Sequence, residues 1–163
     1  NVAGVYAIGD VNGQSMLAHT ASAEGLVAIE NICGGQATID YGKIPSCVYV
    51  TPEIAAVGLT EEAARATYPE LKTGYFPLSG NGKSLIEGDT SGFVKILVNG
   101  ANGEMVGAHL FAHHATDMIG GLTSLLHTKA SLADVLGTVY PHPSGAEAIS
   151  EAFHAVEGRA IHA

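Results

Sequence analysis

The segment at residues 140–147, YPHPSGAE, places a histidine five positions before a glutamate. If Glu147 holds one ring nitrogen of His142, the other nitrogen is available for proton transfer near neutral pH. The same stretch contains Ser144-x-x-Glu147, the capping-box pattern that begins helices without any catalysis. Taken by itself, the spacing favours a capped helix start with an exposed histidine, and acid–base chemistry is the alternative.

Asp10 is a second candidate because it follows the apolar run 5–8, which we expect to be a short buried strand. A carboxylate at the carboxyl end of a parallel strand can accept hydrogen bonds from sugar or ribityl hydroxyl groups. An aspartate bonded to its own backbone in a turn is the alternative, which spacing alone favours. The helix expected over 16–32 presents free N–H groups near its start, where they could face the electron-rich edge of a cofactor ring.

Three histidines near the end of an expected strand raise the question of a metal. Alternation places His109 and His113 on one face, with His114 next to them. Apart from Asp117, no cysteine or carboxylate pair nearby completes a ligand set. We therefore expect interface or solvated histidines and no metal site.

Composition excludes several classes of function. The net charge of −9 disfavours binding to phosphate backbones, so no nucleic-acid partner is expected. No window of 18 apolar residues and no signal peptide is present, so no membrane association is expected. Cys33 and Cys47 form no CxxC motif and have no basic neighbour in sequence, so we expect buried, inert thiols in a reducing compartment.

The pattern of apolar residues indicates half of a βα nucleotide-binding element followed by a larger domain. Strands are expected at 5–8, 47–50, 54–59, 72–78, 92–98 and 104–111, and helices at 16–32, 60–66, about 115–127, about 131–137 and about 145–157. A run of strands followed by helices predicts an α+β domain with an antiparallel sheet flanked by helices. We place the domain boundary near residue 44, which gives a short βα element over 1–43 and the α+β domain over 44–163.

Five stretches of the chain, in order, resemble one family, the flavin-dependent pyridine nucleotide–disulfide oxidoreductases. GVYAIGDV with MLAHTASAEG resembles the last FAD-binding segment of that family, and IPSCVYVTPEIAAVGLTEEAA resembles the entry into its dimerisation domain. GYFPLSGNGKSLIEGDTSGFVKILV, GEMVGAHLFAHHATDMIG and HPSGAEAISEA continue in the same order. The resemblance covers essentially all 163 residues.

The resemblance implies a role in FAD binding for residues near the start of the chain. In the family, an aspartate bonds the ribityl chain of FAD, and the resemblance gives this role to Asp10. A helix begins beside the flavin ring in the family, and the resemblance places that helix start at Met16, Leu17, Ala18 and His19.

For the later part of the chain, the resemblance implies that His142 exchanges protons with active-site thiols and that Glu147 orients it. In the family this pair reaches the disulfide of the other subunit, so a homodimer is expected. Here HPSGAE replaces the usual HPT-x-S/T-E, and Gly145 should loosen the first turn of the helix.

The activity implied is oxidation of dihydrolipoamide to lipoamide with NAD⁺, with FAD between them and with lipoyl-carrying components of 2-oxoacid dehydrogenase complexes as possible partners. A glutathione-reductase-like enzyme or a non-catalytic dimerisation or assembly module is the alternative. The redox CxxxxC, the GxGxxG motif and the NAD domain are not in this sequence. We therefore expect a C-terminal fragment that is inactive by itself, binds FAD weakly or not at all, and comes from a cytoplasmic protein, or from the mitochondrial matrix of a eukaryote.

Overall fold

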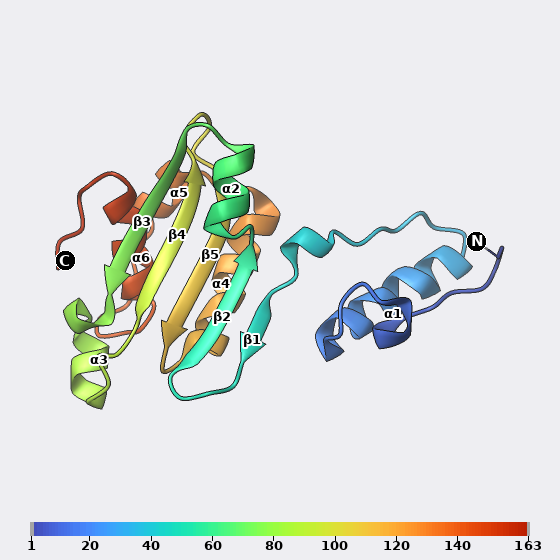
Figure 1. Cartoon of the computed structure of the whole chain (residues 1–163), viewed down its shortest axis with the longest axis horizontal. Helices are drawn as coiled ribbons and strands as arrows, with labels where there is room; N and C mark the ends of the chain where they lie inside the picture. The colour runs from blue at the N-terminus through green and yellow to red at the C-terminus, as the bar shows by residue number, and fades with distance from the viewer. Residues whose placement is uncertain (1, 163) are drawn as a thin grey trace. The chain divides into compact units, whose positions relative to one another are not determined.

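A computed structural model describes residues 2–162 and divides them into two units, one that ends at Ile44 and one that begins at Pro45 (Figure 1). The first unit contains the 3-10 turn η1 (Gly9–Asn12), the long helix α1 (Ala18–Ile32) and the 3-10 turn η2 (Tyr41–Lys43). Each unit is described here by itself.

The expectation of a buried strand over residues 5–8 is wrong. These residues form no strand, and Val5, Tyr6 and Ile8 are exposed by 69%, 46% and 46%. A strand is stable only when a neighbour pairs with its backbone. No strand is present anywhere in residues 2–44, so this apolar run has no partner within its own unit.

The second unit is built on one five-stranded sheet in the order β1-β2-β5-β4-β3, with every neighbouring pair antiparallel. Its strands are β1 (Ser46–Val48), β2 (Glu53–Gly58), β3 (Leu71–Pro77), β4 (Phe93–Asn99) and β5 (Met105–Ala112). Its helices are α2 (Glu61–Thr67), α3 (Gly82–Glu87), α4 (Ala115–Thr128), α5 (Leu132–Leu136) and α6 (Glu147–Val156), and the 3-10 turn η3 (Leu78–Gly80) precedes α3. The predicted α+β class with an antiparallel sheet is confirmed.

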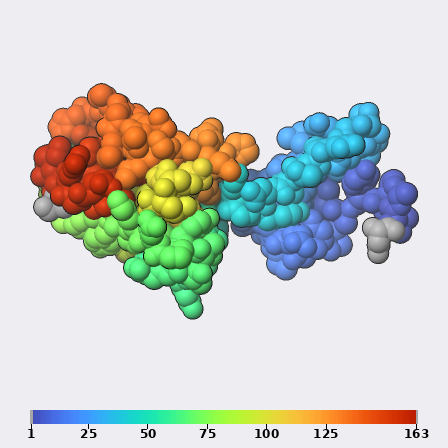
Figure 2. Space-filling view, turned by 90° about the horizontal axis from the view of Figure 1, so that it is seen from above, coloured from blue at the N-terminus to red at the C-terminus, as the bar shows by residue number. Residues whose placement is uncertain are grey.

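The sheet lies between two layers of helices. Helices α4 and α6 pack on one face, against β2 and β5 and against β3 and β4, and α2 covers part of the other face. Figure 2 shows the orange and red atoms of the C-terminal segments and the green atoms of the segment with α2 on opposite sides of the yellow atoms between them. The main core fills the space between the sheet and α4–α6, and its largest fully buried side chains are Phe76, Phe153, Ile96, Leu110 and Leu122.

Alternation along the strands explains the two layers, because successive side chains of a strand point to opposite faces. In β4, Ile96 and Val98 enter the main core, whereas Leu97 packs with Ala64 of α2 in a smaller cluster. Helix α2, expected over 60–66, is capped by Thr60, whose Oγ1 accepts the N–H of Ala63. No helix in the described part of the chain is long and apolar enough to cross a membrane.

Candidate active site

The loop before α6 carries His142 and is held in place by a buried asparagine at the start of α3. Asn81 is only 3% exposed, and its Oδ1 accepts the N–H of Ser84 and so caps α3. Its Nδ2 donates to the backbone oxygen of Ser144 at 3.0 Å. Asn81 therefore joins the start of α3 to the loop between His142, whose bond to Pro143 is cis, and α6. No motif in the sequence pointed to this link.

The capping box predicted at Ser144 does not form in the expected way. The N-cap of α6 is Ala146, no side chain caps the helix, and the hydroxyl of Ser144 is buried without a hydrogen-bond partner among the described residues. Only the reverse half of the motif is present, in which the N–H of Ser144 donates to Oε2 of Glu147 at 2.8 Å. Helix α6 starts later than predicted because Gly145 and Ala146 form a turn first.

His142 and Glu147 are in contact, with Nδ1 of the imidazole 2.9 Å from Oε1 of the carboxylate. A carboxylate only accepts, so Nδ1 carries the hydrogen and Nε2 is the nitrogen that can exchange a proton. Burial by itself raises the pKa of Glu147, but the hydrogen bonds from Ser144 and His142 outweigh it and hold the pKa below its ordinary value. The imidazole is 76% exposed and the carboxylate 26%, so the histidine is the accessible member of the pair.

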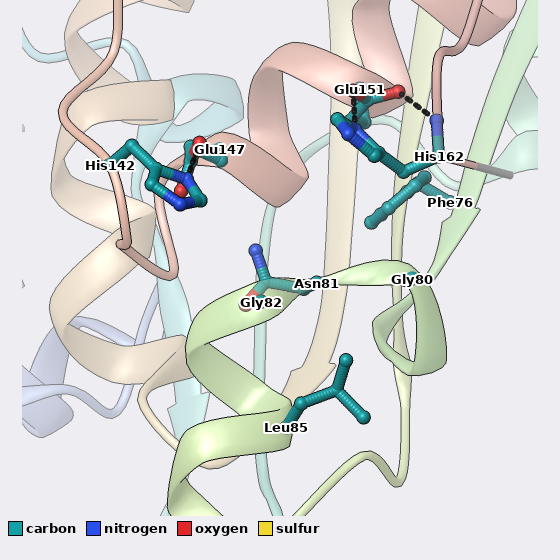
Figure 3. A pocket seen from close by; sticks show the side chains of 9 residues that line it. All are labelled: Phe76, Gly80, Asn81, Gly82, Leu85, His142, Glu147, Glu151 and His162. Carbon is teal, nitrogen blue, oxygen red and sulfur yellow. Dashed lines mark hydrogen bonds and ion pairs between the residues drawn. The ribbon is translucent and has the colours of Figure 1, made fainter.

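The pair lines a cavity of about 230 Å³ in the second unit. Figure 3 shows His142 with Glu147 on one side, and the turn and helix around Asn81 across from them. The full lining consists of Phe76, Gly80, Asn81, Gly82, Leu85, His142, Glu147, Glu151 and His162. The geometry can position an imidazole for proton exchange with a group that enters this cavity.

A second histidine–glutamate pair lines the same cavity, and sequence reasoning missed it. Nδ1 of His162 lies 2.8 Å from Oε1 of Glu151, and Figure 3 draws this contact beside the first pair. Glu151 follows Glu147 by one helical turn, so a helical projection of α6 would have placed both carboxylates on one face. His162 lies in the segment after α6, and no local sequence pattern predicts its contact with Glu151.

In the first unit, Asp10 lies in η1 and is exposed. A buried glutamate that the sequence did not single out organises this region. Oε2 of Glu24 accepts the N–H of Gly9 at 2.6 Å, and its Oε1 accepts from Asn12 and from the hydroxyl of Tyr41 at 2.7 Å each. The hydrogen bonds from Asn12, Gly9 and Tyr41, in that order, hold the pKa of Glu24 below its ordinary value.

The start of α1 has features that fit part of a flavin site. Met16 and Leu17 precede the helix, and Ala18 and His19 form its first turn. Leu17 is the N-cap, and no side chain caps the helix, so the first N–H groups retain the partial positive charge of a helix start. Met16 is 74% exposed. These residues, with the exposed carboxylate of Asp10, fit the ribityl and ring contacts expected of them, and they make up only a part of such a pocket.

Of the three histidines considered as metal ligands, His109 has a different hydrogen-bond environment from His113 and His114. His109 Nε2 lies 3.0 Å from the backbone oxygen of Leu59 on one side of the sheet. His113 and His114 follow β5 with their ring centroids 4.4 Å apart, and His114 lies 3.7 Å from Glu87. Within residues 2–162, no group of three or more His, Cys, Asp or Glu side chains is arranged to hold a metal ion.

The two cysteines are both free. Cys47 is half-buried, and burial raises the pKa of its thiol, with a smaller contribution from the charge of Glu53. Cys33 is exposed at the end of α1, so the expectation that it is buried is wrong. The residue caps a helix whose last turn lies on the outside of its unit, which the apolar spacing did not reveal.

Residues 44–153 match the model of the pyridine nucleotide-disulphide oxidoreductase dimerisation domain. The chain belongs to this family. The match includes the whole sheet, the loop with His142 and most of α6. The family predicted from the ordered segments is therefore confirmed.

Relatives of this oxidoreductase domain include the dihydrolipoyl dehydrogenases of Bacillus subtilis, 44% identical over 161 residues, and of Zymomonas mobilis, 42% identical over 164 residues. The alignments cover 97% and 99% of this chain but 34% and 35% of those proteins, so the chain spans about a third of the length of the curated relatives it matches. The crystal structure of LpdA from Mycobacterium tuberculosis is similar with a TM-score of 0.86 and 28% identity, over 91% of this chain and 33% of that one.

Proposed function

We propose that this chain is part of a flavoprotein that oxidises dihydrolipoamide to lipoamide with NAD⁺. His142 is the acid–base residue, and Glu147 is the residue that positions it. The observation that carries the proposal is the 2.9 Å contact between Nδ1 of His142 and Glu147, which leaves Nε2 to serve the cavity. The names of the relatives, which are dihydrolipoyl dehydrogenases, supply the reaction.

The reaction gives the histidine a defined task. A dithiol loses two electrons and two protons when its S–S bond forms, NAD⁺ takes one proton with the electron pair as hydride, and the other proton is released to water. A base must remove protons from sulfur, because the thiolate and not the thiol is the nucleophile in disulfide exchange. Nε2 of His142 takes the proton, and the carboxylate of Glu147 stabilises the resulting imidazolium through Nδ1.

Residues 1–43 are proposed to belong to the FAD-binding domain and residues 44–163 to the dimerisation domain. Asp10 would accept hydrogen bonds from the ribityl hydroxyl groups of FAD, and Met16 to His19 would lie beside the ring, with the uncapped start of α1 facing its electron-rich edge. The chemistry that FAD supplies when bound is transfer of the electron pair from sulfur to the nicotinamide. Glu24 would fix the backbone that carries Asp10.

The redox-active sulfurs must come from outside the described residues. Cys33 lies in the first unit and Cys47 on the first strand of the second, and they form no disulfide. We propose that His142 serves the disulfide of a second subunit, so that the active form is a homodimer, consistent with the dimerisation domain that the chain matches. By itself the chain is expected to dimerise, to bind FAD weakly or not at all, and to be inactive.

The biological setting follows from the substrate. Dihydrolipoamide occurs as lipoyl groups carried by components of 2-oxoacid dehydrogenase complexes, which are proposed as the partners. The protein is proposed to act in the cytoplasm, or in the mitochondrial matrix if it is eukaryotic.

A chimeric enzyme tests this proposal. The part of the Bacillus subtilis dihydrolipoyl dehydrogenase that aligns with this chain is replaced by the chain, and reduction of NAD⁺ by dihydrolipoamide is measured. His142→Gln in the chimera should lower kcat by about 10²- to 10⁴-fold, the usual contribution of a general base, while the flavin spectrum is unchanged. His127→Gln, an exposed histidine of α4 outside the cavity, is the matched control and should have no effect.

Two results would contradict the proposal. Turnover close to normal in the His142→Gln chimera would exclude the acid–base role and would favour a non-catalytic assembly module. Reduction of glutathione disulfide in preference to oxidation of dihydrolipoamide would favour the glutathione-reductase alternative. Sedimentation of the isolated chain at micromolar concentration should show a dimer, and a clean monomer would count against the homodimer.

A further inference from the structure

Two carboxylates of α6 line the cavity of the candidate active site. Glu151 follows Glu147 by one turn of α6, so both side chains lie on the same face of the helix, and both line the cavity. Glu151 is only 7% exposed. Two ionised carboxylates four residues apart on a helix repel each other weakly, and a nearby positive charge offsets this repulsion.

The segment after α6 brings a histidine to Glu151. Oε2 of Glu151 accepts the backbone N–H of Ile161 at 2.7 Å and that of His162 at 3.4 Å, and Oε1 contacts Nδ1 of His162 at 2.8 Å. One buried carboxylate therefore holds both the backbone and the side chain of this segment. Figure 3 shows the segment with His162 beside Phe76 and across from Gly80.

A close backbone approach fixes the segment from the opposite side. A Cβ atom at Gly80 would collide with the backbone oxygen of His162 and would lie 2.9 Å from Cζ of Phe76. Only glycine at position 80 leaves room for this packing. His162 is thus set against η3 and α6 together, although its side chain remains 63% exposed.

The four titratable groups of the cavity are the two histidine–glutamate pairs. The other lining residues, Phe76, Gly80, Asn81, Gly82 and Leu85, carry no ionisable side chain. Lys83 of α3 is paired with Glu87 at 3.0 Å and does not line the cavity. The charge balance around Glu147 therefore depends on His142, Glu151 and His162.

We infer that His162 is a positioning residue for the His142–Glu147 pair: held by Glu151, it supplies the positive charge that lets two neighbouring carboxylates of α6 remain ionised, so that Glu147 continues to hold His142. The inference rests on the proposed function, in which the ionised form of Glu147 is the one that orients the imidazole. Histidine is suited to this because it carries a proton in the acidic range, where carboxylates begin to titrate.

The shifts of both carboxylates have the direction that this role requires. Burial by itself raises the pKa of Glu151, but the hydrogen bond from His162 and those from the backbone outweigh it, and the pKa is lowered. Burial also raises the pKa of Glu147, and the charge of His162 is one of the smaller contributions that lower it, after those of Ser144 and His142. Loss of His162 should therefore raise the pKa of Glu147.

An NMR titration of the Glu147 carboxyl group in this chain tests the inference without any enzyme assay. His162→Gln should raise the pKa of Glu147 by about 0.5 unit, a modest shift because the imidazole is largely solvated. In the double variant Glu151→Gln with His162→Gln, the pKa should return to the original value, because the uncompensated charge has gone. His127→Gln is again the matched control and should leave the titration unchanged.

A second variant displaces the segment that carries His162 without mutating any of the four titratable residues. Gly80→Ala should push His162 away from η3 and should raise the pKa of Glu147 in the same direction as His162→Gln. An unchanged pKa in His162→Gln would overturn the inference. A rise that persists in the double variant would also overturn it, because a merely structural effect of residue 162 is not reversed by removing Glu151.

The two proposals can fail separately. If the titration responds as expected but His142→Gln leaves turnover of the chimera unchanged, the proposed function fails and the charge coupling stands. If His142→Gln abolishes turnover but the titration does not respond to His162→Gln, only the positioning role fails. If His162 has this positioning role, His162→Gln in the chimera should shift the acidic limb of the pH–activity profile to higher pH.

Discussion

The backbone N–H of Ser144 donates to Oε2 of Glu147 at 2.8 Å, while the hydroxyl of the same serine is buried without a partner in the described part of the chain. The carboxylate is thereby fixed through one oxygen, and the other oxygen is left for His142 at 2.9 Å. Ser144 therefore holds Glu147 through its backbone N–H, and its side chain does not cap α6.

Ser144→Ala should therefore cost little. The backbone donor is kept and a buried hydroxyl without a partner is removed, so the free energy of unfolding should change by less than about 0.5 kcal/mol or should rise. Ser131→Ala is the matched comparison, because Ser131 forms a complete capping box with Asp134 at the start of α5 and its loss should cost about 1 kcal/mol. Urea denaturation measures both. Equal costs would show that the Ser144 hydroxyl contributes to the helix start after all.

Gly74→Ala should destabilise the domain and disturb the site together. A Cβ atom at Gly74 in β3 would collide with the backbone oxygen of Ala152 and would lie 2.7 Å from Cγ2 of Val156, so α6 must move away from the sheet. We expect a loss of about 3 kcal/mol in the free energy of unfolding, at the upper end for overpacking. Chemical denaturation checks this value.

Gly120→Ala is the control for this substitution. The position lies in α4, and a Cβ atom there meets nothing within 4 Å. Alanine should raise stability by about 0.5–1 kcal/mol, because glycine is a poor helix former. If Gly74→Ala were as well tolerated as Gly120→Ala, the contact between α6 and β3 would be looser than the structure shows.

Glu53 should give the domain a pH-dependent part of its stability. Its Oε2 accepts the N–H and the hydroxyl of Thr116 at 2.9 and 2.8 Å, and so caps α4 from the neighbouring strand β2. These bonds, the backbone bond first, hold the pKa of Glu53 below its ordinary value. A lowered pKa in the folded state adds stability above the pKa of the unfolded chain, and this stability is lost as the pH falls through the folded-state value.

Glu53→Gln should therefore cost about 1 kcal/mol at pH 7, the usual effect of losing a helix cap, and much less at pH 3. Thermal denaturation at the two pH values measures the difference. Glu70→Gln, an exposed glutamate of the same unit, should have little effect at either pH. If the loss of stability in Glu53→Gln were the same at both pH values, the charge of Glu53 would not be what stabilises the domain.

The features that the sequence could predict are those with a local signal. The helices expected at 60–66, at about 115–127 and at about 145–157 are each encoded within a few neighbouring residues, and the structure has α2, α4 and α6 there. The contact of His142 with Glu147 is also short in sequence, which is why spacing could suggest it.

The features that the sequence could not predict depend on distant partners. The run 5–8 has the composition of a strand but no neighbour within its unit. Glu24 accepts hydrogen bonds from Gly9, which precedes its helix in the sequence, and from Tyr41, which follows it. Asn81 donates to the backbone of Ser144, 63 residues later in the chain. The pair of Glu151 with His162 joins a helix to the segment that follows it. Tertiary packing decides such contacts, and a linear pattern does not record them.

The order of the strands has a consequence for folding. β5 is the central strand and pairs with β4, its neighbour in sequence, and with β2, where Glu53 faces Ala112. The β4–β5 pairing closes a short loop, whereas the β2–β5 pairing closes a long one and should be slower. α6 docks on β3 and β4, and it can do so only once those strands present a surface. The contact between His142 and Glu147 is therefore expected to form late in folding, after the framework that supports it has already formed.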